Sequence, residues 1–295
     1  MLIDSPITVT TLTRRRPGLL ARAIASVRSQ DYAGPIEHLV VVDDDPESVV
    51  QLEEMALRAN DGPNAQLRRL RWHLAPRSEQ ERRNLLRERG YVYPRLARLL
   101  NIGVRLASSP WVAFLDDDNE YEPNHLSSLA ECAHMSGSRA VHAARRVFNA
   151  DGTPYLEKLF PGAANTEAGA RLYRLMCDRG VWVPGTNILQ DRVDPDQTTF
   201  RNSTVMDSDD PMFLVDQNLW LIDRKILLTL PVPEDFTPDE IDHNTCPDDK
   251  MLEVLVRNRI DITSSRLPTV RYYLGGISNG DEQPRGRLSG IDDTT

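Results

Sequence analysis

Three consecutive aspartates follow an apolar run at two places in the chain, at Asp43 to Asp45 and at Asp116 to Asp118. Adjacent carboxylates repel one another, so each group calls for a positive charge nearby. For the second group three explanations stay open: a solvated loop, caps for a helix that begins after Pro123, or ligands of a hard divalent cation. Carboxylates are natural ligands of Mg²⁺ and Mn²⁺, and such ions usually keep positions open for substrate phosphates.

The segments in front of these aspartates are predicted strands of one α/β sheet. Runs of β-branched or apolar residues fill 7–13, 36–42 and 111–115, and the segments 14–32 and 93–109 between them are predicted helices. Alternation of strands and helices is typical of a mostly parallel sheet with helices on both faces. Ligands of such sheets bind beyond the carboxyl ends of the strands. We therefore expect both aspartate groups at one edge of the sheet.

The second half of the chain has a more mixed pattern. Two strands are predicted across the turn "NADGTP", a strand followed by a helix over 218–230, and a helix over 247–260. The acidic stretch "MDSDDPMF" follows no apolar run and is interpreted as a loop. From Gly275 onward the chain is rich in glycine, proline and polar residues, which predicts a mobile tail.

Composition excludes several classes of protein. A net charge of -9 over 295 residues argues against nucleic acid as the main partner, because binding phosphates needs a basic surface. The three cysteines lie far apart without metal-binding spacing, as expected of buried thiols in a reducing cytoplasm. The first residues lack the pattern of a signal peptide, and no apolar run reaches the ~20 residues of a membrane span. We expect a cytoplasmic protein with no transmembrane segment; a homo-oligomer is compatible with the sequence.

Taken together, the segments resemble the glycosyltransferases of family 2. The resemblance rests on "RPGLLARAI" (Arg16 to Ile24), "VVDDDPES" (Val41 to Ser48) and "NIGVRLASSPWVAFLDDDNEYEP" (Asn101 to Pro123). It covers about the first 135 residues well and implies the Rossmann-like, nucleotide-binding glycosyltransferase A fold. Residues 1–135 would then form the sugar-nucleotide-binding half, 136–274 an acceptor-binding half of the same domain, and 275–295 the tail.

The resemblance also implies roles for single residues. Asp43 or Asp44 would accept a hydrogen bond from the nucleotide base, most often uracil. Asp118, the last of the Asp-x-Asp motif, would bind the Mn²⁺ or Mg²⁺ that bridges the diphosphate, and Asp116 would approach the ribose and the metal. The other nucleotide-binding residues implied in this way are Thr11, Thr13, Arg16 and, in the variable middle position of the motif, Asp117.

A catalytic base is implied near the start of a later helix. The stretch "CPDDKMLEVLVRNR" resembles the "ED" element of inverting members, which places Asp249 at the base and Asp248 at the glutamate as an alternative. Both carboxylates would also suit a helix cap, because the helix dipole favours negative charge in the first turn.

The chain departs from the family pattern in its arginines. Arg14 and Arg15 stand where Tyr-Asn is common, and Leu100 stands where an arginine is common, so Arg95 and Arg98 are candidates to replace it. Arginine forks suit phosphate, and the stretch before residue 105 is rich in them. Its candidates for holding the diphosphate are Arg77, Arg82, Arg83, Arg95 and Arg98. The alternatives are that these arginines form a solvated helix face or a basic patch that meets an anionic acceptor.

The resemblance predicts metal-dependent, inverting transfer of a sugar from a nucleotide-diphosphate sugar, most often a UDP-sugar, to an unidentified acceptor hydroxyl. A sugar-nucleotide pyrophosphorylase is the first alternative, but the glycine-rich loop of that class is missing after the first strand. A relative that binds nucleotide or carbohydrate without turnover is the second. His243, just before the predicted base, is a candidate to line the acceptor pocket.

Overall fold

The computed structural model describes residues 4–59, 67–83, 89–161, 163, 165–197, 200, 214–242 and 245–275. The predicted loop around Asp207, the candidate His243 and the tail beyond Gly275 lie outside these residues.

Four parallel strands form the first half of the sheet, in the order β3-β2-β1-β4. β1, β2 and β4 are runs of mostly β-branched or apolar residues and are buried along almost their whole length, as expected of a sheet covered on both faces. The edge strand β3 is rich in arginine and only partly buried. The strands are β1 (Ile7–Thr13), β2 (Ile36–Asp43), β3 (Arg68–Ala75) and β4 (Trp111–Phe114).

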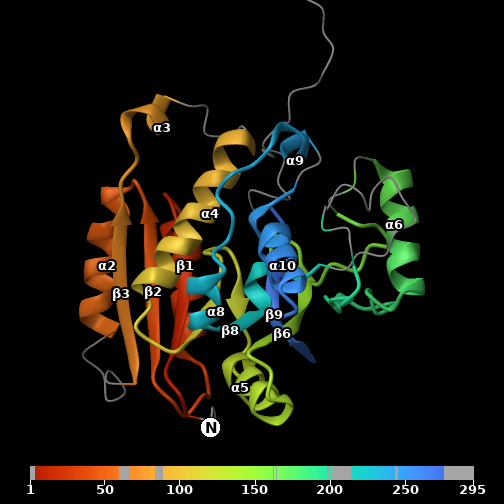
Figure 1. Cartoon of the computed structure of the whole chain (residues 1–295), viewed down its shortest axis with the longest axis horizontal. Helices are drawn as coiled ribbons and strands as arrows, with labels where there is room; N and C mark the ends of the chain where they lie inside the picture. Colours follow the sequence, from red (N-terminus) through yellow and green to blue (C-terminus); the bar gives the residue numbers. More distant parts are fainter. Residues whose placement is uncertain are drawn as a thin grey trace, which may run out of the picture.

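Helices cover both faces of this half (Figure 1). On one face Val40 and Val42 of β2 pack with Leu20 of α1 and Leu52 of α2, and on the other Leu39 of β2 packs beneath α4. This alternation follows from the two-residue period of a strand. The helices of this half are α1 (Pro17–Arg28), α2 (Pro46–Ala59), α3 (Glu79–Arg83) and α4 (Arg89–Leu106). The next helix along the chain, α5 (His125–Ser136), packs against β6 and β9 of the second half.

The second half continues the same sheet with mixed strand directions. β8 pairs antiparallel with both β4 and β6, β6 runs parallel to β9, and β5 and β7 pair at its margin. The predicted α/β fold with a mixed second half is confirmed. These strands are β5 (Glu120–Tyr121), β6 (Ala140–Phe148), β7 (Ile188–Leu189), β8 (Trp220–Asp223) and β9 (Ile262–Tyr273). The remaining elements are α6 (Thr166–Asp178), the 3-10 turn η1 (Gln217–Leu219), α8 (Arg224–Thr229), α9 (Pro238–Asp242) and α10 (Pro247–Arg257).

The Asn-x-Gly of α4 has a packing role. A Cβ on Gly103 would lie 2.2 Å from Cγ2 of Thr10, so only glycine lets α4 approach β1 this closely. Asn101 donates to the carbonyl of Val232 at 2.8 Å and accepts from its N–H at 3.0 Å. This motif therefore fixes α4 against the sheet and against the segment before α9.

Within the described residues, no helix combines the length and the apolar character needed to cross a bilayer.

Candidate active site

The carboxyl ends of β1, β2 and β4 bring the two aspartate groups to one edge of the sheet. Thr13 of β1 pairs with Val42, one residue before Asp43, and Thr10 pairs with Phe114, two residues before Asp116. The parallel register therefore places both groups beside the end of β1, as the sequence predicts.

Asp43 is enclosed by two arginines. Arg95 Nε donates to its Oδ1 at 3.0 Å, and Arg77 Nε donates to the same oxygen at 3.1 Å while its Nη2 bonds Oδ2. The side chains of Arg95 and Arg77 are 8% and 11% exposed. These arginines were predicted to hold a diphosphate; in this structure their partner is the carboxylate that ends β2.

The two following aspartates are also paired. Arg82 donates to Asp44 through Nε at 3.0 Å and Nη2 at 2.7 Å, and this pairing lowers the Asp44 pKa to about 2. Burial acts to raise the Asp45 pKa, but hydrogen bonds from Ser48 and from the Arg15 N–H lower it. Asp44 and Arg15 both have positive φ angles, 50° and 55°, so the chain is held in a sparsely populated conformation at both strand ends.

The second aspartate group has fewer cationic partners. Asp117 accepts from the Thr13 hydroxyl at 2.7 Å and from Arg16 Nη1 at 3.1 Å. The same Arg16 nitrogen donates to Oδ2 of Asp118 at 3.0 Å. One guanidinium thus serves two carboxylates. Burial outweighs Arg16 at both of them, raising the Asp117 pKa to about 6 and also raising that of Asp118.

Among the described residues, the hydrogen-bond partners of the Asp116 carboxylate are side-chain amides. The side chains of Gln217 and Asn218 donate to its two oxygens, Asn218 at 2.8 Å, and the Asp116 N–H donates to Asn218 Oδ1 at 2.5 Å. Burial raises the Asp116 pKa well above its usual range, and the negative charges of Asp118 and Asp216 add to the effect.

The two candidates for the base have different surroundings. Asp249 is buried and accepts from the N–H of Cys246 at 3.0 Å and from its thiol at 3.3 Å, which closes a capping box on α10. Asp248 is half-buried and accepts from the Gln217 N–H at 3.1 Å. Burial raises the Asp248 pKa to about 8, with the charges of Asp216 and Asp249 contributing. Asp248 is therefore the carboxylate that lies against the turn holding Asp116.

Other predicted site residues lie apart from this cluster. Thr11 is fully buried and shares a hydrogen bond of 2.8 Å with His38 Nε2. Arg98 bonds Glu81 at 3.1 Å and Glu234 at 3.2 Å. Arg83 pairs with Glu79 along α3.

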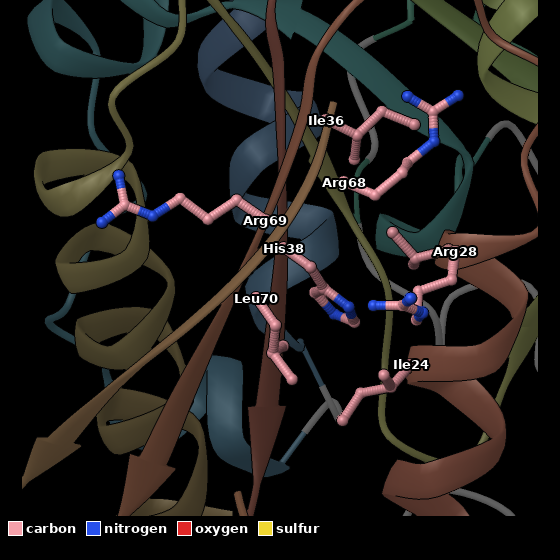
Figure 2. A pocket seen from close by; sticks show the side chains of 8 residues that line it. Ile24, Arg28, Ile36, His38, Arg68, Arg69 and Leu70 are labelled. Carbon is pink, nitrogen blue, oxygen red and sulfur yellow. The ribbon is translucent and has the colours of Figure 1, made fainter. Parts of the chain in front are cut away.

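A small cavity between α1 and the sheet lies beside His38 (Figure 2). Figure 2 shows Ile24 and Arg28 of α1 facing His38 and Leu70 of the sheet. Its volume of about 10 Å³ suits a water molecule at most, so it is not a nucleotide site. Burial lowers the His38 pKa to about 3, which keeps the imidazole neutral.

The metal prediction depends on what Asp116 and Asp118 offer to a cation. Within the described residues, no three His, Cys, Asp or Glu side chains gather as a metal-holding group. Mg²⁺ sites of phosphate enzymes need only one or two carboxylates, because substrate phosphates and water complete the shell. Asp118, which accepts from Arg16 through one oxygen and lies close enough to Asp116 for their charges to interact, fits such a shared site.

Comparison with known proteins agrees with this architecture. A model described as Glycosyl transferase family 2 matches residues 8–205, more than half of the chain. The chain belongs to glycosyltransferase family 2. The match includes both aspartate groups and ends before Asp248 and Asp249. No curated protein matches the chain.

Solved structures of similar fold include S. aureus TarS and a mannosyltransferase from Pyrobaculum calidifontis. The 1–349 form of TarS is 12% identical with a TM-score of 0.51, over 91% of this chain and 60% of TarS. Its complex with UDP-GlcNAc is 14% identical with a TM-score of 0.50, over 91% and 58%. The mannosyltransferase PcManGT, in complex with GDP-Man and Mn²⁺, is 15% identical with a TM-score of 0.50, over 92% and 56%. These likenesses concern the fold, and this chain spans less than two thirds of each solved chain.

The sequence reasoning missed Gln217, Asn218 and Arg145. Gln217 and Asn218 precede an apolar strand that reads as core, and nothing in the local pattern pairs them with Asp116, about a hundred residues earlier. Arg145 lies in a predicted strand. An arginine in a strand that is expected to be buried is the feature of the sequence that could have singled it out.

Proposed function

We propose that this protein transfers a sugar from a nucleotide-diphosphate sugar to an acceptor hydroxyl, with a divalent cation and inversion at the anomeric carbon. UDP-sugars are the first donors to test, followed by GDP-sugars. The observation that supports this most is the Asp116 to Asp118 group, a set of carboxylates with raised pKa values at the ligand-binding edge of a family 2 sheet. A cation brought in with a diphosphate would relieve their repulsion.

Asp118 would be the main ligand of the cation, and Asp116 would approach it as well. When bound, Mn²⁺ or Mg²⁺ supplies Lewis-acid stabilisation of the departing diphosphate. Arg16 lies on the same carboxylates and is placed to contact the diphosphate as well. Thr13 fixes Asp117 from the end of β1, so these side chains are held in place before the donor arrives.

For the base we favour Asp248 over Asp249. The Asp249 carboxylate is bonded to its own helix start, whereas Asp248 is half-buried beside Gln217. A raised pKa suits a general base, which works best when its pKa lies near the working pH. In the proposed step the acceptor oxygen bonds the anomeric carbon, its proton passes to Asp248, and the nucleoside diphosphate leaves.

Asp43 and Asp44 remain the candidates for contacting the base of the nucleotide. Their arginine partners do not exclude this role, because an ionised carboxylate offers about four lone-pair sites. Arg77, which bonds Asp43 and whose N–H donates to Asp44, would then border the base as well.

The deciding experiment is calorimetric titration of UDP, GDP and dTDP, each with and without Mn²⁺, into wild type and Asp118→Ala. We expect metal-dependent binding of one nucleotide that is lost in the variant. Donor hydrolysis or transfer, assayed with UDP-GlcNAc and GDP-Man in parallel, separates an enzyme from a relative that only binds. If a folded wild type bound none of the nucleotides, the proposal would be wrong.

A further inference from the structure

One short turn bonds both carboxylates on which the proposed transfer depends. In η1 and its flank, the Gln217 side chain donates to Asp116, while the Gln217 backbone N–H donates to Asp248 at 3.1 Å. Asn218 exchanges two hydrogen bonds with Asp116, one accepted from its N–H at 2.5 Å and one donated to its carboxylate at 2.8 Å. Gln217 is thus bonded to both carboxylates, Asp116 and the proposed base Asp248, and its neighbour Asn218 is bonded to Asp116.

The turn is itself anchored by a buried ion-pair network. Asp216 accepts from the Asn218 N–H at 3.0 Å and from its side-chain nitrogen at 2.6 Å. Arg145 of β6 bonds the other oxygen of Asp216 and also bonds Asp191 at 3.0 Å, with its guanidinium 4.7 Å from the centre of the Tyr272 ring. Arg145, Asp191 and Asn218 are 8%, 3% and 0% exposed.

This network costs desolvation energy, and an apolar core of the same shape would often be as stable. What it provides is fixed geometry, because a guanidinium fork bonded to Asp191 and Asp216 leaves little freedom to the turn that begins at Asp216. Removal of such supporting bonds around a metal site typically costs about 10–100-fold in affinity or activity. The arrangement is therefore suited to setting where Asp116 and Asp248 stand.

We propose that the turn Asp216–Asn218, anchored by Arg145, is a positioning device that holds Asp116 and Asp248 at a fixed separation for the transfer. Gln217, Asn218 and Arg145 are then positioning residues that touch neither donor nor acceptor. The inference rests on the proposed function, and it adds that the geometry of the reaction is set from β6, through the bonds that Arg145 makes to Asp216 and Asp191.

The test compares Gln217→Leu and Arg145→Lys with wild type. Gln217→Leu removes the side-chain amide from Asp116 but keeps the backbone N–H that bonds Asp248. Arg145→Lys keeps a buried positive charge but cannot reproduce the two-carboxylate fork. The matched control is Arg146→Met, because the next residue of a strand points to the opposite face and Nε of the Arg146 side chain has no hydrogen-bond partner among the described residues.

Three quantities are measured: the melting temperature, kcat and KM for donor turnover, and the Kd of Mn²⁺ in the presence of UDP. We expect both variants to fold, kcat to fall about 10–100-fold with little change in donor KM, and Gln217→Leu to weaken Mn²⁺ binding by a similar factor. The control should match wild type in all three.

Each outcome decides the question. If Gln217→Leu and Arg145→Lys fold and keep both kcat and Mn²⁺ affinity, the inference is wrong while the proposed function stands. If wild type binds Mn²⁺ with UDP but turns over no donor, the proposed function fails, and a weakened Mn²⁺ affinity in Gln217→Leu still supports positioning of Asp116. If Arg145→Lys does not fold, Gln217→Leu decides alone.

Discussion

The two aspartate groups have the same residue types, follow strands of the same sheet and end at the same edge, yet their electrostatics are opposite. Asp43 and Asp44 meet Arg77, Arg82 and Arg95, and the pKa of Asp44 falls to about 2. At the second group a single guanidinium serves two carboxylates, amides hold the third, and all three pKa values are raised.

The difference separates two uses of one motif. The first group is paired with arginines from α3, from α4 and from the segment before α3, which ties the end of β2 to these segments. Carboxylates that are buried beside one another with too little positive charge are suited to a cation that arrives from outside. The second group is therefore the candidate for holding the cation, a distinction that the motif alone does not make.

The largest expected effect concerns Asp248, the carboxylate that joins the second group from α10. Asp248→Asn should lower kcat about 10²–10⁴-fold, because the acceptor proton loses its base. Asp249→Asn should affect mainly stability, by about 1 kcal/mol, through the helix cap. Since burial raises the Asp248 pKa to about 8, wild-type activity should increase as pH approaches 8 from below. Steady-state kinetics across pH on both variants is the measurement, and a larger kcat loss in Asp249→Asn would reverse the assignment.

The next effect is on stability and contrasts the groups directly. Asp43→Ala leaves two largely buried arginines without their carboxylate and should cost about 3 kcal/mol of unfolding free energy. Asp118→Ala should cost far less, because its charged form is already disfavoured and Arg16 keeps Asp117. Urea unfolding of both variants gives the comparison. Equal losses would mean that the two groups do not differ as described.

The smallest expected effect is the pH dependence of stability that Asp44 of the first group contributes. The pKa of Asp44 is about 2 in the folded protein, below the ~3.9 of an unfolded chain, so its stabilising contribution is present above pH 4 and is lost as pH falls toward 2. Asp44→Asn should be slightly less stable than wild type at pH 7, where this contribution is present, and the difference should disappear as pH falls toward 2. Thermal melts from pH 2 to 7 would show it, and parallel curves for the two proteins throughout would contradict the pairing with Arg82.

The first three strands of the parallel half, their common direction and the edge where the aspartates gather could be predicted from the amino-acid sequence. These follow from local periodicity and from the rule that parallel strands end on one side, so Thr13, Asp43 and Asp116 could be placed together before any coordinates. The motif with Asn101 and Gly103 was likewise readable as a family feature. The reason for the glycine is the close contact between Gly103 and Thr10, which only the folded structure shows.

The pairing of the charged side chains could not be predicted in this way, because it depends on how distant segments pack. Arg77 and Arg95 reach Asp43 from 34 and 52 residues away, and Gln217 and Asn218 reach Asp116 from 101 and 102 residues away. The choice between Asp248 and Asp249 depends on which carboxylate the start of α10 uses for its own cap. Such pairings are set by how distant segments pack, and a local pattern contains no information on that packing.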